Sequence, residues 1–171
     1  MTMENNSDKA DALSLRRHCK TCPNELHCCS RATTIVVLPD EAEMITARTN
    51  KPSLLVRDES GLFTVAKAPY RPCPFLTSDR LCGIYDIRPT DCKSWPLTLA
   101  DHNSTKLLVD TACPASRLSL SADFVAAASE RLFTVPSDMR ADYIRLVHRD
   151  SLPLALYGET STGAVTWRAS L

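Results

Sequence analysis

Residues 72–96 read PCPFLTSDRLCGIYDIRPTDCKSWP, and neither a helix-period nor a strand-period pattern of apolar residues runs through them. The stretch holds three single cysteines, Cys73, Cys82 and Cys92, together with four prolines. Because proline fixes φ and removes a backbone donor, a segment of this composition is expected to be irregular. We therefore expect an α+β fold: a small single domain with an irregular, cysteine-rich centre tied by metal, short β-hairpins and a C-terminal helical pair.

Regular elements are predicted on both sides of this centre. The β-branched run at residues 33–38 is typical of a strand, and residues 39–47 are typical of a helix. Asp40 is expected to be the N-cap of that helix, with Glu43 completing a capping box. Two hairpins are expected, at residues 54–66 and 97–110.

A pair of helices is predicted after the second hairpin. Ser121 is expected to cap the first of these helices and Ser137 the second. In each helix the apolar residues recur at a spacing that puts them on one face. The two faces consist of Phe124, Val125, Ala128 and Leu132 in the first helix and Met139, Tyr143, Leu146 and Val147 in the second.

Domain boundaries are expected near the two ends of the chain. Residues 1–14 are polar and lack periodicity, which predicts a disordered tail. Residues 15–150 are predicted to form a cysteine-cluster metal-binding domain, and residues 151–171 a C-terminal extension.

Composition argues against several classes of function. The 171 residues include 20 Lys and Arg against 20 Asp and Glu, so the basic excess of a phosphate binder is missing and no nucleic-acid partner is expected. No apolar run is long enough to span a bilayer, and the first residues lack the apolar core of a signal peptide. We therefore expect a cytoplasmic protein without a membrane partner, whose redox or protein partner the composition does not identify.

Eight cysteines in a chain with 4 glycines are the unusual feature of the composition. They are Cys19, Cys22, Cys28, Cys29, Cys73, Cys82, Cys92 and Cys113. In a reducing compartment such a set favours metal ligation over disulfides, and two intervening residues let Cys19 and Cys22 reach one metal. The side chains of Cys28 and Cys29 diverge in an extended backbone, so these residues serve different sites or only one of them ligates.

Three motifs together resemble the YkgJ-type cysteine-cluster family. They are Cys-x2-Cys-x5-Cys-Cys at residues 19–29, Cys-Pro-Phe-Leu at residues 73–76 and Cys-x-Ile-Tyr-x-x-Arg-Pro-x-x-Cys at residues 82–92. The resemblance covers roughly residues 19–114 and implies the binding of zinc or iron. Some members are called Fe–S oxidoreductases, so a redox reaction is one expectation. The gap before the paired cysteines is longer here than is usual in the family.

Three functions compete on this evidence. The first is one or two Fe–S clusters, with 4Fe–4S favoured, serving electron transfer or a redox or maturation reaction; four thiolates saturate one cluster, so eight are enough for two. The second is a zinc-stabilised binding module without catalysis, and the third is an iron enzyme with an open coordination position. Ordinary core packing of the thiols is the remaining alternative. The sequence names no catalytic residue and leaves open whether the protein is an enzyme.

Four further residues near the cysteines are candidates for the same site. Arg88 is placed to offset thiolate charge, or to form a salt bridge with a neighbouring aspartate, Asp86 or Asp91. Tyr85 is placed to shield a cofactor from solvent, or to pack in the core. The two histidines that flank the first group, His18 and His27, are either ligands or polar loop residues.

Overall fold

In the computed structural model, residues 29, 34–68, 71–103, 106–113, 116, 120–150 and 154–157 are described. Within them the chain forms an α+β fold with two three-stranded antiparallel sheets. The first sheet has the order β1-β3-β2, with β1 at Val36–Val37, β2 at Leu55–Arg57 and β3 at Phe63–Val65. The second has the order β4-β5-β6, with β4 at Leu97–Leu99, β5 at Leu107–Asp110 and β6 at Leu154–Leu156.

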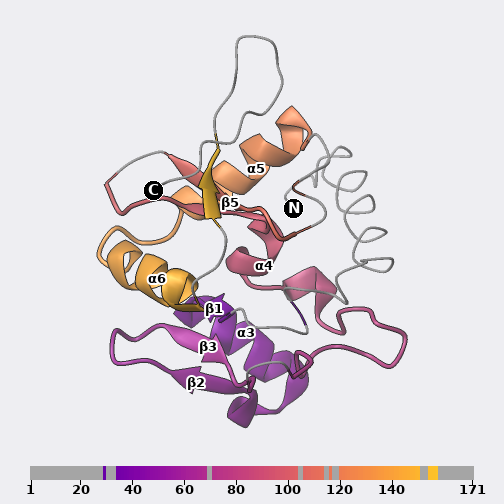
Figure 1. Cartoon of the computed structure of the whole chain (residues 1–171). Helices are drawn as coiled ribbons and strands as arrows, with labels where there is room; N and C mark the ends of the chain where they lie inside the picture. The colour runs from indigo at the N-terminus through magenta and orange to yellow at the C-terminus, as the bar shows by residue number, and fades with distance from the viewer. Residues whose placement is uncertain are drawn as a thin grey trace, which may run out of the picture.

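Helices cover and connect these sheets. The α-helices are α3 at Pro39–Thr49, α4 at Thr90–Ser94, α5 at Ala122–Phe133 and α6 at Arg140–Val147. Short 3-10 helices lie at Pro52–Leu54, Tyr85–Ile87 and His148–Asp150. Helix α4 lies in the middle of the molecule, between α3 and α5 (Figure 1). No helix of the described residues is long and apolar enough to cross a membrane.

Strand β1 separates two hydrophobic cores. Successive side chains of a strand point to opposite faces, so alternate residues of this segment enter different cores. Val36 and Leu38 belong to the first core, whereas Ile35 and Val37 belong to the second. The first core also takes residues from β4, β5, α5 and α6, together with Leu62 just before β3 and Val135 just after α5: Leu62, Leu97, Leu99, Leu107, Val109, Phe124, Ala128, Leu132, Val135, Tyr143, Leu146 and Val147. The second core adds Ala42, Ile45, Val65, Cys73, Phe75 and Ile84.

The two predicted hairpins are present. Strands β2 and β3 pair antiparallel with Val56 opposite Thr64, and β4 pairs with β5 with Thr98 opposite Leu108. The turn between β2 and β3 includes Gly61 at φ 87°, a backbone conformation that glycine adopts without steric cost. Strand β6 adds to β5, so residues 154–156 belong to the second sheet.

The beginning of α3 differs from the prediction. Leu38, not Asp40, is the N-cap, because Pro39 occupies the first helical position, where its missing N–H costs nothing. Glu41, not Glu43, reaches back, and its Oε2 accepts a hydrogen bond from the Leu38 N–H at 3.0 Å. The helix itself is confirmed, but its N-cap and its capping-box glutamate each lie two residues earlier in the sequence than predicted.

The C-terminal helical pair is confirmed with one corrected cap. Ser121 caps α5, accepting a hydrogen bond from the Phe124 N–H at 3.1 Å, as expected. Helix α6 begins after Met139, so the prediction that Ser137 caps it is wrong. The predicted faces of the two helices pack into the first core.

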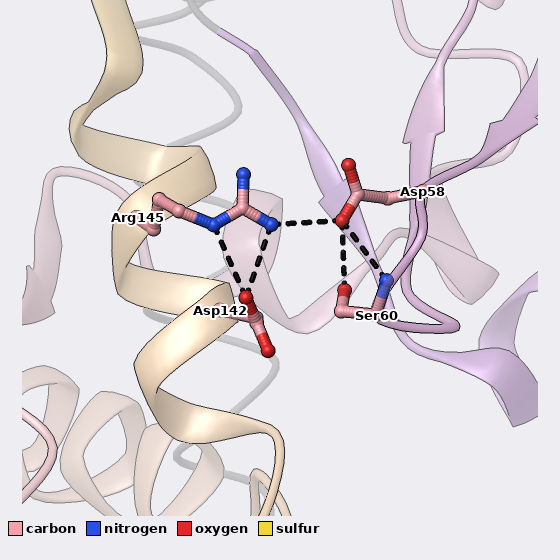
Figure 2. A network of polar contacts seen from close by, with 4 residues as sticks. All are labelled: Asp58, Ser60, Asp142 and Arg145. Atoms are coloured by element: carbon pink, nitrogen blue, oxygen red, sulfur yellow. Dashed lines mark hydrogen bonds and ion pairs between the residues drawn. The ribbon is translucent and has the colours of Figure 1, made fainter.

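A surface network joins α6 to the turn between β2 and β3. The Arg145 guanidinium bridges Asp58, at 2.8 Å, and Asp142, at 3.1 Å, and the Asp58 carboxylate also accepts two hydrogen bonds from Ser60 (Figure 2). These hydrogen bonds hold the pKa of Asp58 below its usual value, with the Ser60 side chain making the largest contribution. Because the pair is exposed, its contribution to stability is small.

Candidate metal centre

Four cysteines from separate segments meet at the second core. Cys73 is buried within this core, and Cys29, Cys82 and Cys92 pack against it while partly exposed. We refer to these four residues as the cysteine cluster. Cys29 belongs to the first cysteine group of the sequence, whereas the other three belong to the second, so the fold brings the two groups together.

Cys29 and Cys73 are joined directly by the backbone. The Cys73 N–H donates a hydrogen bond to the Cys29 carbonyl oxygen with an N···O distance of 2.6 Å. This bond connects the N-terminal segment to the start of the irregular stretch.

Cys73 and Cys82 lie at the two ends of a small folded loop. Leu76 and Cys82 form an isolated antiparallel bridge, and the Gly83 N–H donates to the Phe75 carbonyl at 2.7 Å. A Cβ atom at Gly83 would lie 3.2 Å from that carbonyl oxygen, so glycine permits the close return of the chain. The predicted irregular centre is therefore an ordered loop held by backbone hydrogen bonds.

Cys92 sits on α4, a five-residue helix within the predicted irregular centre that the sequence pattern did not indicate. The preceding Pro89 is the N-cap, and it is followed by Thr90 and Asp91, both buried. Helix α4 packs against β1, β4 and α5. The third position of this helix thus presents a thiol to the second core from a fixed backbone.

Two thiols of the cysteine cluster, those of Cys73 and Cys92, have raised pKa values. The pKa of Cys73 is raised to about 12, mainly by burial and in smaller part by the charges of Cys29 and Cys82. Burial also raises the pKa of Cys92 well above its usual value, as do the charges of Asp91, Cys29 and Cys73. Each thiol would therefore make ionisation of its neighbours harder, and a bound metal is the kind of charge that reverses this effect.

Cationic side chains lie near the cysteine cluster. Lys67 opposes the increase in the pKa of Cys73, and Arg88 opposes the increase in that of Cys92. The Arg88 guanidinium stands 3.8 Å from the centroid of the Tyr85 ring, and its Nε donates to the Tyr85 carbonyl at 3.2 Å. Arg88 is therefore close enough to act on the charge of Cys92, the first of its predicted roles, and it also stacks on Tyr85, a contact that was not predicted.

Asp86 and Asp91, the two predicted salt-bridge partners of Arg88, bond to other groups. Asp86 pairs instead with Arg48, at 3.1 Å on the surface. Asp91 is 3% exposed, and its two oxygens accept hydrogen bonds from the Val36 N–H at 3.0 Å and from the Tyr143 hydroxyl at 3.3 Å. The expectation that one of these residues pairs with Arg88 is therefore wrong, because each is closer to another donor.

Two buried carboxylates are the residues that sequence reasoning missed. The pKa of Asp91 is raised to about 7, because burial and the nearby charge of Glu41 outweigh the hydrogen bonds from Val36 and Tyr143, which lower it. Glu41 is 5% exposed and accepts hydrogen bonds from both the N–H and the hydroxyl of Thr90. A buried carboxylate costs several kcal/mol unless such bonds compensate it. The helix-start pattern of the sequence was assigned to Asp40 and Glu43, so it gave no signal for a role of Glu41.

Cys113, which is described, is not one of the residues that pack at the second core. Cys113 lies in the turn after β5, where its carbonyl accepts hydrogen bonds from the N–H of Ser116 at 2.9 Å and from its hydroxyl at 2.6 Å. The other candidate ligands, which are Cys19, Cys22, Cys28, His18 and His27, lie outside the described residues. Among the residues that are described, no three His, Cys, Asp or Glu side chains are arranged to hold one metal ion.

The donor set nevertheless suits a metal that prefers sulfur. Thiolates bind zinc, and they hold iron in Fe–S clusters, where four of them saturate one cluster. The cysteine cluster brings cysteines from four segments to one apolar core, and the first cysteine group continues in the sequence directly before Cys29. The residues present therefore fit a thiolate-bound metal or cluster completed by ligands near Cys29.

Comparison with protein families gives one match that bears on this site. A family model described as a "putative zinc- or iron-chelating domain", CxxCxxCC, matches residues 18–114, which is more than half of the chain. The chain belongs to the CxxCxxCC family. The matched region includes all eight cysteines, and the family description supports metal binding by this domain without specifying the type of centre. Comparison with curated proteins and with solved structures gave no match.

Proposed function

We propose that this CxxCxxCC domain binds one or two Fe–S clusters, of the 4Fe–4S type, through its cysteine thiolates. The observation that carries the proposal is the convergence of Cys29, Cys73, Cys82 and Cys92 on one apolar core. Plain core packing would not gather residues of one rare type from four segments. The alternative of a zinc ion or a single iron ion uses the same thiolates.

Two features favour a cluster over structural zinc. Structural zinc sites usually take paired Cys-x-x-Cys turns, and this chain has one such turn, at Cys19 and Cys22. The cysteine cluster also lies against apolar side chains, which include Ile45, Phe75 and Ile84. Apolar enclosure limits solvent access and thereby tunes the potential of a redox centre.

The protein's own residues would then hold the centre and adjust its charge. Thiolates from the cysteine cluster and from the first cysteine group would bind it, while Arg88 and Lys67 would offset part of the negative charge. When bound, the cluster would supply one-electron transfer, in a soluble electron carrier or a redox or maturation enzyme. No catalytic residue is assigned.

Anaerobic purification of the full chain tests the proposal. Iron, acid-labile sulfide and zinc are measured per chain, and the optical spectrum is recorded for thiolate-to-iron absorption. Iron and sulfide in equal amounts with a brown colour would support the cluster. A colourless protein with stoichiometric zinc would support the zinc-stabilised module, and a chain without either metal would contradict metal binding altogether.

A further inference from the structure

Glu41 connects the beginnings of two helices. Its Oε2 accepts a hydrogen bond from the Leu38 N–H at 3.0 Å, at the start of α3. Its Oε1 accepts two more, from the Thr90 N–H at 2.6 Å and from the Thr90 hydroxyl at 2.8 Å, at the start of α4. One carboxylate therefore fixes the N-terminus of α4 relative to α3, across 49 positions of sequence.

Asp91 connects the same short helix to two other elements. Its Oδ2 accepts from the Val36 N–H of β1, 55 positions away in the sequence, and its Oδ1 accepts from the Tyr143 hydroxyl of α6. Val36, Asp91 and Tyr143 are each at most 3% exposed, so water does not compete for these bonds. Helix α4 is consequently attached to α3, β1 and α6 through two side chains.

A helix of five residues has little stability of its own, because nucleation costs more than its few internal hydrogen bonds return. Its position must therefore come from its attachments. Cys92 directly follows Asp91 and lies two positions after Thr90, so whatever holds these residues also sets where the Cys92 thiol stands relative to Cys29 and Cys73.

We infer that Glu41 and Asp91 are positioning residues for the metal centre, which hold α4 so that Cys92 meets the other thiols of the cysteine cluster. This inference rests on the proposed function, since it requires that the cysteine cluster binds a metal. Residues that orient metal ligands are known to be as important as the ligands for affinity, and their loss typically costs about 10–100-fold.

The test compares variants that alter single bonds. Thr90→Val removes the hydroxyl that donates to Glu41 but keeps the hydrogen bond from the backbone N–H. Thr90→Ser keeps a hydroxyl at this position. Asp91→Asn removes the negative charge and replaces one acceptor oxygen with an amide donor, at nearly constant side-chain volume. Asp138→Asn is the matched control, because Asp138 is an exposed carboxylate away from α4.

Each full-length variant is purified anaerobically, and release of iron and zinc to EDTA is followed by elemental analysis, together with the optical spectrum. Measurements are made well below the unfolding temperature, where far-UV circular dichroism matches that of the wild type. We expect Thr90→Val and Asp91→Asn to release metal about 10–100-fold faster and to have altered spectra, with Thr90→Ser and Asp138→Asn like the wild type.

Unchanged release and spectra in folded Thr90→Val and Asp91→Asn would overturn the inference and leave these residues a purely structural role. If Asp91→Asn does not fold, Thr90→Val decides, since it loses one hydrogen bond. A wild-type chain that carries neither iron nor zinc would instead defeat the proposed function, and the inference with it, before any variant is compared.

Discussion

The backbone N–H of Cys73 donates a hydrogen bond to the carbonyl oxygen of Cys29, with an N···O distance of 2.6 Å. The two residues come from the two cysteine groups of the chain, which a strand, a helix and a hairpin separate. Their contact places the end of the first group beside the beginning of the second. A metal bound there would close a long loop, which restricts the unfolded chain much as a disulfide does.

This contact predicts a site with ligands from both groups. Deletion of residues 19–29 should remove metal from the remainder of the chain, because Cys29 and its neighbours then no longer meet Cys73. A peptide of residues 15–32 should bind metal only loosely for the same reason. Metal content and chelator competition measure both. A peptide that reconstitutes a stable, native-like metal site alone would contradict a shared site.

Single alanine substitutions should separate ligands from packing residues. Replacing Cys73, Cys82 or Cys92 with alanine is expected to reduce the metal content per chain, because alanine offers no thiolate in place of the one removed. Val65→Ala is the control, since it makes a cavity in the same core without removing a thiol. Cys113→Ala is expected to reduce the metal content per chain, but the metal bound at the cysteine cluster should remain in place.

Elemental analysis of the anaerobically purified variants provides the measurement. Full metal loading in the three cluster variants would leave core packing as the role of these cysteines. Complete metal loss in Val65→Ala would mean that core volume, rather than ligation, controls loading.

Removal of metal should loosen the molecule unevenly. Residues 71–94 lie around the cysteine cluster and have little regular structure to hold them, so their amides are expected to lose protection. Helices α5 and α6 pack on the first core, whose described residues include no cysteine, and should remain protected. Hydrogen exchange of the metal-free and metal-bound forms checks this, and equal protection of residues 71–94 in both forms would oppose it.

Two contacts on α6 should differ in their contribution to stability. Tyr143→Phe leaves an oxygen of the buried Asp91 without its hydroxyl donor, which is expected to cost about 1–3 kcal/mol of unfolding free energy. Arg145→Ala removes the exposed pair with Asp58, and its effect should be small and should vanish at high salt. Urea unfolding at low and high salt compares them, and a larger loss in Arg145→Ala would reverse this ranking.

His148 should make the fold less stable in mild acid. Burial lowers the pKa of His148 from its usual value of 6.5, although a hydrogen bond with the Leu99 backbone opposes this. Because the folded pKa is depressed, the unfolded chain binds the proton more readily. The favourable contribution of neutral His148 is present above pH 6.5 and is lost as the pH falls through the folded pKa.

Unfolding temperatures between about pH 7.5 and pH 5 measure this effect in the wild type and in His148→Gln, which does not titrate in that range. The wild type should lose more stability than the variant on acidification. His102→Gln, at an exposed histidine, is the control and should behave like the wild type. Parallel curves for the wild type and His148→Gln would show that His148 is not responsible.

Patterns local in the sequence determined much of the architecture. Apolar spacing identified α5 and α6, the Ser121 cap followed from its side-chain oxygen, and the alternating segments around turn residues identified both hairpins. These features depend on hydrogen bonds and faces within a few residues, which the sequence displays directly. The cysteine spacings indicated metal binding for the same reason, since ligand motifs are local.

Tertiary packing decided which residues meet. The alternation of β1 between two cores brings Cys29 and the second group to one side, and no local pattern encodes which of eight cysteines are gathered there. Tertiary packing also buries Glu41 and Asp91, two acidic residues near helix starts, where they accept hydrogen bonds from donors 49 to 55 positions away in the sequence. Such partners are fixed by the burial of both elements, because a desolvated carboxylate must take whatever donors the packed fold places beside it.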